Sequence, residues 1–274
     1  MKNWLNAAFT ILASLFIAFI LTSGFDAINS TLEETPLLSG MMNLVFASFM
    51  PALLWIANKK INHLSTQQYG FTTRRLTWSL ITGIGLACIS VTAILVMACL
   101  SGIPVLFTGS LQVRPAIIFQ LIATNLATGI WEEAVFRGFI FNTLLKHRAC
   151  IVIAGMITAV LFAGLHATAF MDTKSLWWFV IIILLAYILL YLYLITRSIW
   201  APVAFHFAWD LLWSIPESPI GVFSVTDFEN HTEYIDQISV LPLVVIAGIL
   251  IAIGKRKQVG IRYLNIIQTA HTHN

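Results

Sequence analysis

Charge is what this sequence lacks most. Lysine, arginine, aspartate and glutamate together make up 10% of its 274 residues, whereas hydrophobic residues make up 59%. A water-soluble domain of this length cannot bury so much apolar surface, so the composition predicts an integral membrane protein. The sequence also shows no tandem repeat, low-complexity tract or separate soluble domain, which favours a single membrane domain over residues 1–274.

Cysteine is scarce as well. Cys88, Cys99 and Cys150 lie within or at the ends of apolar segments and form no C-x-x-C pair. The sequence therefore suggests neither a disulfide framework nor a thiolate metal site.

Apolar runs of about 20 residues, the length that crosses a bilayer, recur along the whole chain. The expected spans are residues 4–23, 38–57, 79–100, 116–145, 150–170, 176–196, 199–215 and 238–254. The first span follows Lys2 and could be a cleaved signal sequence, but its length favours an uncleaved anchor. The sequence thus predicts an all-α polytopic membrane protein with about eight transmembrane helices.

Basic and acidic residues outside these spans alternate from one loop to the next. One set of loops and both ends of the chain contain 12 of the 15 basic residues and no acidic residue: Lys2, Lys59, Lys60, Arg74, Arg75, Lys146, Arg148, Arg197, Lys255, Arg256, Lys257 and Arg262. The other loops contain Arg114, Lys174 and nine acidic residues: Asp26, Glu33, Glu34, Asp172, Glu217, Asp227, Glu229, Glu233 and Asp236. Because basic loops stay in the cytoplasm, we expect both termini to be cytoplasmic. With a net charge of only +3, the basic loops indicate topology in a lipid bilayer rather than nucleic-acid binding.

Four charged side chains and two histidines remain inside the expected spans. They are Glu132, Glu133, Arg137, His166, His206 and Asp210. Each ionised group at the middle of a bilayer costs on the order of 2.5–3.5 kcal/mol on insertion scales. Groups this unfavourable persist when they pair, line a cavity or take part in chemistry, so the six residues are the candidates for a functional site.

The first three candidates lie in the sequence "GIWEEAVFRG". Glu133 and Arg137 have i,i+4 spacing, so they share a helix face and can neutralise each other. Glu132 is turned by about 100° from Glu133 on a regular α-helix, so the same pair does not occupy it. The Glu133–Arg137 pair alone is more typical of a structural ion pair than of catalysis.

The histidines add two further i,i+4 pairs. His206 precedes Asp210 in "HFAWD", and Phe162 precedes His166 in "FAGLH". Either pair alone could be an ordinary interhelical contact. The helical rise puts Glu132 at about 21 Å, Asp210 at about 20 Å, His206 at about 14 Å and His166 at about 27 Å from the cytoplasmic ends of their helices. Three non-adjacent helices therefore bring their polar groups to one central layer, as in a single buried site.

A glutamate, two histidines and a second carboxylate can hold and deprotonate a water molecule, either on a metal ion or through hydrogen bonds alone. The His206–Asp210 pair can then stabilise the oxyanion that forms when water attacks a carbonyl. The reaction class is hydrolysis, plausibly of a peptide bond at or within the membrane. Water is the expected nucleophile, because H-E-x-x-H, G-x-S-x-G and Gly-x-Gly-Asp motifs are all missing.

The ordered motifs E-E-x-x-x-R, F-x-x-x-H and H-x-x-x-D resemble those of the CPBP family, the CAAX-prenyl-protease and bacteriocin-processing proteins, also called the ABI family. The resemblance covers residues 129–212 and implies catalytic helices within residues 116–215. It implies a membrane endopeptidase acting on membrane-associated peptides or proteins. By this likeness Glu132 and His166 activate the water, His206 and Asp210 stabilise the oxyanion, and Glu133 and Arg137 support the site.

Asp210 departs from the asparagine found in eukaryotic members of the family. An ionised aspartate cannot donate a hydrogen bond to an oxyanion, so Asp210 is protonated, orients His206 or binds a cation. The resemblance covers both metal-dependent and metal-independent enzymes, so the cofactor is none or a divalent metal such as zinc, held by Glu132, His166 and His206. The short loops favour a bacterial cytoplasmic membrane as the location.

Three other functions fit parts of the pattern. A proton- or ion-coupled transporter could use the same polar groups as a conduction path, although repeats and paired broken helices typical of transporters are missing. Two membrane histidines could ligate haem, although such a site would not need Glu132 or Arg137. A non-catalytic immunity or scaffold protein could retain the fold without the reaction.

Overall fold

The computed structural model describes residues 2–32, 35–57, 59–60, 65–103, 105–107, 114–147, 149–166, 176–217, 223–225 and 228–259. The elements in chain order are α1 (Lys2–Ser30), α2 (Pro36–Ala57), α3 (Thr66–Tyr69), α4 (Leu76–Leu100), β1 (Val105–Phe107), α5 (Pro115–Glu133), the π-helix η2 (Ala134–Phe141), α6 (Asn142–Lys146), α7 (Ile151–Leu165), α9 (Leu176–Thr196), α10 (Trp200–Glu217), β2 (Phe223–Val225) and α11 (Phe228–Arg256). The prediction of an all-α fold is confirmed. Two three-residue strands, β1 and β2, pair antiparallel between loops.

Each of the eight expected spans coincides with a helix or a helical run. Five helical stretches in the described ranges are long and apolar enough to cross a membrane: Ala7–Ser30, Pro36–Ala57, Leu76–Leu100, Leu176–Thr196 and Glu233–Arg256. Among the others, α7 has only 15 residues, and the run from α5 to α6 contains four charged side chains. The protein is therefore an integral membrane protein, and the number of eight crossings stays a prediction.

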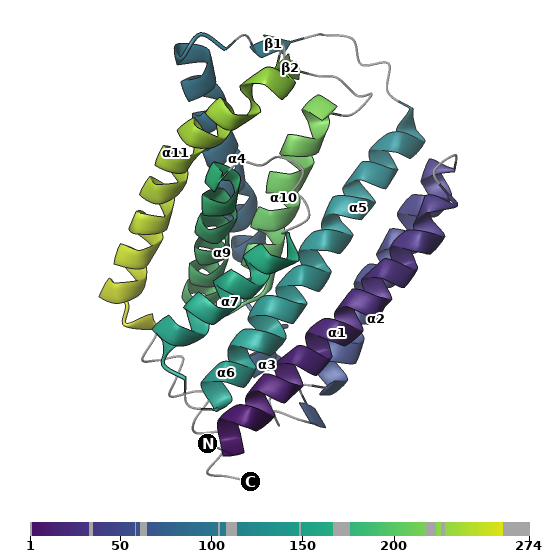
Figure 1. The fold of residues 1–274 in the computed structure, drawn as a ribbon, viewed down its shortest axis with the longest axis vertical. Coiled ribbons are helices and arrows are strands. Elements are labelled where there is room, and N and C mark those ends of the chain that lie inside the picture. Colours follow the sequence, from purple (N-terminus) through teal and green to yellow (C-terminus); the bar gives the residue numbers. More distant parts are fainter. Residues whose placement is uncertain are drawn as a thin grey trace.

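The helices form an elongated bundle in which α1 and α2 lie along one side and α11 lies on the other (Figure 1). The N-terminal end of α1 and the C-terminal end of α11 lie at the same end of the bundle (Figure 1). That both termini are cytoplasmic stays a prediction from the charge of the loops.

Close helix packing in the bundle depends on small residues. A Cβ atom added to Gly83 of α4 would lie 2.3 Å from the carbonyl oxygen of Ala201 on α10, and one added to Gly40 of α2 would lie 2.7 Å from Phe119 of α5. At Gly129 of α5 the added atom would lie 3.2 Å from the carbonyl oxygen of Val203 on α10. Because lipid offers no hydrophobic drive for helices to associate, such close contacts supply much of the attraction between them. They place α10 against both α4 and α5.

The long helical run of α5, η2 and α6 begins at Pro115, whose missing N–H is harmless at a first helical position. The run was expected to be one α-helix over residues 116–145, but η2 interrupts its α-helical pattern from Ala134 to Phe141. A π-helix forms hydrogen bonds between residues five apart rather than four apart, so carbonyl groups where it meets an α-helix lose their regular N–H donors. The Asn142 side chain donates to the carbonyl oxygens of Arg137 and Gly138 at 3.3 and 2.7 Å, and the Tyr69 hydroxyl donates to that of Ala134 at 3.2 Å. These side chains satisfy the backbone of the widened segment.

Candidate active site

The Glu133–Arg137 pair lies at the junction of α5 and η2, and both side chains are fully buried. Arg137 Nη1 donates to Glu133 Oε1 at 2.6 Å, and its Nη2 donates to the carbonyl oxygen of Ala186 on α9 at 3.1 Å. The guanidinium carbon also lies 4.8 Å from the centre of the Phe162 ring on α7, a cation–π contact. The arginine therefore joins α5, α7 and α9, and its charge is compensated by three groups.

His206 of α10 is the centre of the polar cluster. Its Nδ1 lies 3.1 Å from Glu133 Oε1, its Nε2 lies 3.3 Å from Asp210 Oδ2, and the same Nε2 lies 3.8 Å from Glu132 Oε2. The expected i,i+4 contact between His206 and Asp210 is thus present. The sequence interpretation had paired Glu133 with Arg137 alone, whereas one oxygen of Glu133 accepts from both Arg137 and His206.

His166 lies directly after the last residue of α7, so the apolar run expected over 150–170 ends as a helix at Leu165, and residues 167–170 lie outside the described residues. The Nδ1 atom of His166 lies 2.9 Å from the carbonyl oxygen of Phe162. Because a carbonyl oxygen can only accept, Nδ1 carries a proton, and in the neutral ring Nε2 then carries the lone pair. That Nε2 lies 4.0 Å from Glu132 Oε2.

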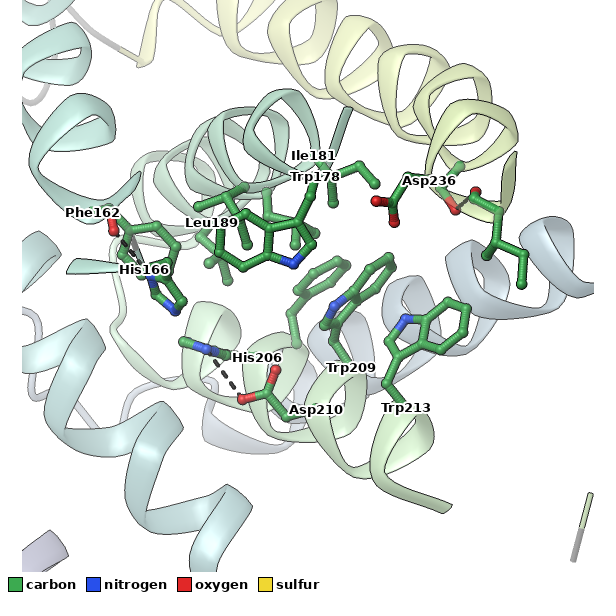
Figure 2. Close-up of a pocket in the computed structure, with 15 residues that line it drawn as sticks. Phe162, His166, Trp178, Ile181, Leu189, His206, Trp209, Asp210, Trp213 and Asp236 are labelled. Atoms are coloured by element: carbon green, nitrogen blue, oxygen red, sulfur yellow. Dashed lines mark hydrogen bonds and ion pairs between the residues drawn. The ribbon is translucent and has the colours of Figure 1, made fainter. Parts of the chain in front are cut away.

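A cavity of about 390 Å³ lies beside this cluster. Its polar wall contains His166, His206 and Asp210, and Figure 2 shows the two imidazoles next to each other with Asp210 beneath His206. The rest of the wall is mainly apolar and aromatic: Phe162, Trp178, Ile181, Ile182, Leu185, Leu189, Phe205, Trp209, Trp213 and Ile235. Glu132, Glu133 and Arg137 do not line the cavity, so they lie behind the imidazoles.

The backbone carbonyl of Asp210 is linked to α5 through Ser214. The Ser214 hydroxyl donates to the Asp210 carbonyl oxygen at 2.7 Å, and the Asn125 side chain of α5 donates to the Ser214 hydroxyl at 3.3 Å. This chain of contacts links α5 to α10 on the side of the cluster opposite Glu133. Helix α5 therefore contacts this part of α10 at two places, through Glu133 at His206 and through Asn125 and Ser214 at Asp210.

The suggested metal ligands Glu132, His166 and His206 do not form a ligand set. Over the residues that the structure describes, no three His, Cys, Asp or Glu side chains are arranged to bind one ion. A physical reason is the ring of His206, because its Nδ1 lies 3.1 Å from Glu133 and its Nε2 lies 3.3 Å from Asp210, so both nitrogens already have a carboxylate partner. The chemistry below therefore takes no step through a metal.

The sequence interpretation missed one acidic residue of the cavity. It assigned Asp236 to a loop before the span 238–254, whereas α11 begins ten residues earlier and Asp236 lies in the cavity wall with only 8% of its surface exposed. Ser239, one turn further along α11, lines the same wall. The sequence signal that could have indicated this part of the wall is the i,i+3 spacing of Asp236 and Ser239 at the start of an apolar run.

The fold and the buried acid–imidazole cluster define an integral membrane protein with an enzyme-like polar site next to an apolar cavity. Residues 114–212 match the family of Rce1-like proteins, described as type II CAAX prenyl endopeptidase Rce1-like. The match covers about a third of the chain and includes all six candidate residues, so the resemblance to the CPBP family is confirmed over this segment. Neither a curated protein nor a solved structure matches the chain. The family indicates membrane protease activity of the CAAX type.

Proposed function

We propose that this protein is an intramembrane endopeptidase that hydrolyses peptide bonds of membrane-associated proteins or peptides with an activated water molecule. The observation that carries the proposal is the convergence of three side chains from α5, α7 and α10. Glu132 Oε2 lies 4.0 Å from His166 Nε2 and 3.8 Å from His206 Nε2. These separations exceed a direct hydrogen bond and suit groups that share a water molecule.

Glu132 and His166 hold the nucleophilic water. The His166 proton is on Nδ1, so Nε2 accepts one hydrogen of the water, while the Glu132 carboxylate accepts the other. A lone pair of the water oxygen is then free to attack a carbonyl carbon at the cavity wall. Glu132 is the general base, and His166 orients the water.

His206 stabilises the oxyanion. Its Nδ1 faces Glu133 and its Nε2 faces Asp210, so both nitrogens need a proton to donate to these carboxylates. The ring is then a positively charged imidazolium at the cavity wall, which is suited to the negative oxygen of a tetrahedral intermediate. Asp210 orients His206, which is one of the three roles that the departure from asparagine left open.

The proton balance closes within the same groups. Attack of the water forms a carbon–oxygen bond and transfers one proton to Glu132. Collapse of the tetrahedral intermediate breaks the carbon–nitrogen bond, and Glu132 returns the proton to the departing amine. Arg137 keeps Glu133 in place but does not touch the reacting atoms.

The test is cleavage of a membrane-tethered reporter by purified protein in lipid nanodiscs. Glu132→Gln keeps the shape of the side chain but removes the base, so we expect the cleavage rate to fall by about 10²–10⁴-fold. Stability and yield should stay at the wild-type level, because Glu132 Oε2 makes no hydrogen bond to another group of the protein. Retained cleavage by Glu132→Gln would remove this residue from the mechanism.

The role of a metal is tested separately. Elemental analysis of active protein, before and after treatment with a chelator, measures bound metal and activity together. Full activity without bound metal supports the metal-free scheme above, whereas activity that follows zinc content would contradict it.

A further inference from the structure

Tyr69 is a fully buried side chain in a part of the sequence that was expected to be a loop. It is the last residue of the short helix α3 and lies between the expected spans 38–57 and 79–100. Its side chain is nevertheless 0% exposed. Residue 69 also lies outside the segment 114–212 that matches the family, so the match assigns it no role. A buried tyrosine usually binds a partner through its hydroxyl, and its contacts show what it holds together.

The side chain of Tyr69 holds the π-helix η2. Its hydroxyl donates to the carbonyl oxygen of Ala134 at 3.2 Å. A Cβ atom added to Gly138, four residues further along η2, would lie 2.5 Å from the Tyr69 ring, so the ring packs directly on the backbone of η2. Glu132 precedes Ala134 by two residues. The contact therefore holds the helix right beside the proposed general base.

The residues that follow Tyr69 hold the start of α10. The carbonyl oxygen of Gly70 accepts from the N–H of Ile199 at 2.9 Å. The ring of Phe71 packs edge-on against that of Trp200, with the ring centres 5.7 Å apart. His206 follows Ile199 by seven residues, which is about two helical turns. The position of this end of α10 therefore sets the height at which the imidazole meets the cluster.

The π-helix makes the direction of Glu132 sensitive to this contact. A π-helix has more residues per turn than the 3.6 of an α-helix, so each residue is rotated by less than about 100° from the one before. Over the eight residues of η2 this difference turns Glu132 relative to α6. π-helices are rare and depend on groups that satisfy their carbonyl oxygens, and the Tyr69 hydroxyl is one of these groups. The direction of the Glu132 side chain therefore depends on a residue of the expected loop.

We propose that Tyr69 is a positioning residue of this site, which joins η2 to the start of α10 and so keeps Glu132 and His206 at the separation that suits a shared water molecule. That separation is 3.8 Å between Glu132 Oε2 and His206 Nε2. Tyr69 is not among the described residues that line the cavity, so it acts through the two helices and not on the substrate. The proposal rests on the proposed peptidase function, since it assigns Tyr69 a part in the same reaction.

The first experiment measures kcat and KM for the membrane-tethered reporter in nanodiscs. Tyr69→Phe removes only the hydroxyl and keeps the ring against η2. We expect kcat to fall by about 10–10²-fold, as for a catalytic group displaced by up to about 1 Å, while KM stays within about twofold. Tyr191→Phe is the matched control, because it removes the hydroxyl of a tyrosine whose ring packs against Gly254 of α11, and both of its constants should stay within about twofold of wild type.

A second control separates positioning from a general loss of stability. Asn43→Ala removes the hydrogen bond of 2.9 Å from Asn43 Nδ2 to Thr124 Oγ1, which joins α2 to α5 away from the cluster. It should lower the melting temperature about as much as Tyr69→Phe, since each variant loses one interhelical hydrogen bond, but leave kcat of the folded protein within about twofold. An unchanged kcat in Tyr69→Phe, or an equal fall in Asn43→Ala, would overturn the proposal.

A further experiment does not need turnover. The protein is labelled with ¹⁵N-histidine, and the His206 ring signals are identified by their loss in His206→Gln. These signals report the contacts of the two ring nitrogens with Glu133 and Asp210. We expect them to shift in Tyr69→Phe but not in Asn43→Ala or Tyr191→Phe. Unchanged signals in Tyr69→Phe would reject the positioning role even if no reporter were cleaved, whereas shifted signals in a protein that cleaves no reporter would reject only the peptidase function.

Discussion

The first helix and the segment Glu132–Phe141 are both rich in apolar residues, but they have opposite surroundings. In α1, large apolar side chains such as Phe9 and Phe16 are 74% and 63% exposed, as expected for a helix surrounded by lipid. In η2, all eight residues are buried, Arg137 among them. The segment with the charges is therefore the one most enclosed by protein.

This difference shows how a membrane protein accommodates charge. The exposed face of α1 offers no partners, and lipid supplies none, so that face is apolar. Around Glu133, partners come from three helices: Arg137 from η2, His206 from α10 and, through Arg137, the Ala186 carbonyl from α9. Burial in protein rather than average hydrophobicity decides where ionisable groups persist.

The largest expected effect comes from removing a partner in the enclosed segment. Arg137→Ala leaves Glu133 buried with His206 as its remaining partner, so we expect a loss of about 3–5 kcal/mol in the free energy of unfolding. Reversible unfolding in mixed micelles measures it. Arg114→Ala is the matched control, because Arg114 is exposed at the start of α5, and it should change stability by less than about 0.5 kcal/mol.

A double substitution sharpens this prediction. The double variant Arg137→Met/Glu133→Gln removes both charges, so its loss in the free energy of unfolding should be smaller than the sum of the losses of the two single variants. Additive effects of the two substitutions would mean that Glu133 and Arg137 do not depend on each other in the folded protein.

The next effect compares two glycines. A Cβ atom added to Gly138 in η2 would lie 2.5 Å from the ring of Tyr69, whereas one added to Gly24 in α1 would meet nothing within 4 Å. Gly138→Ala must displace the ring whose hydroxyl binds the Ala134 carbonyl, so we expect a loss of about 1–3 kcal/mol. Gly24→Ala should stabilise α1 by up to about 1 kcal/mol, since alanine favours a helix over glycine. Thermal unfolding of both variants measures the difference, and equal shifts would contradict it.

The sequence predicted the helical segments well because the bilayer sets their length. It predicted their ends less well. Hydropathy marks the part of a helix in the membrane, whereas α11 continues outward through polar residues to Phe228. Because the prediction missed this extension, it assigned Asp236 to a loop, whereas the structure has Asp236 in the cavity wall.

Within the site, contacts local in sequence were predictable and distant ones were not. The pairs Glu133–Arg137 and His206–Asp210 follow from i,i+4 spacing alone. The contact of Glu133 with His206 spans 73 residues and depends on how α5 packs against α10. The π-helix has no local signal either, since the groups that satisfy its carbonyls include Tyr69 of α3.

The smallest expected effect lies on the exposed face of α1. Phe16 is surrounded by lipid whether or not α1 is packed against the bundle, so Phe16→Ala should change the free energy of unfolding by less than about 0.5 kcal/mol. Ala7, Ile11 and Ala18 form the buried face of the same helix, at spacings of four and seven residues. Ile11→Ala removes packing on that face and should cost about 1 kcal/mol or more, even though isoleucine is the smaller side chain. Unfolding in bilayers measures both variants. A larger effect at Phe16 than at Ile11 would mean that the exposed face of α1 packs against another protein. In that case both α1 and the segment Glu132–Phe141 would be enclosed by protein, and the comparison between a lipid-exposed and a protein-enclosed helix would fail.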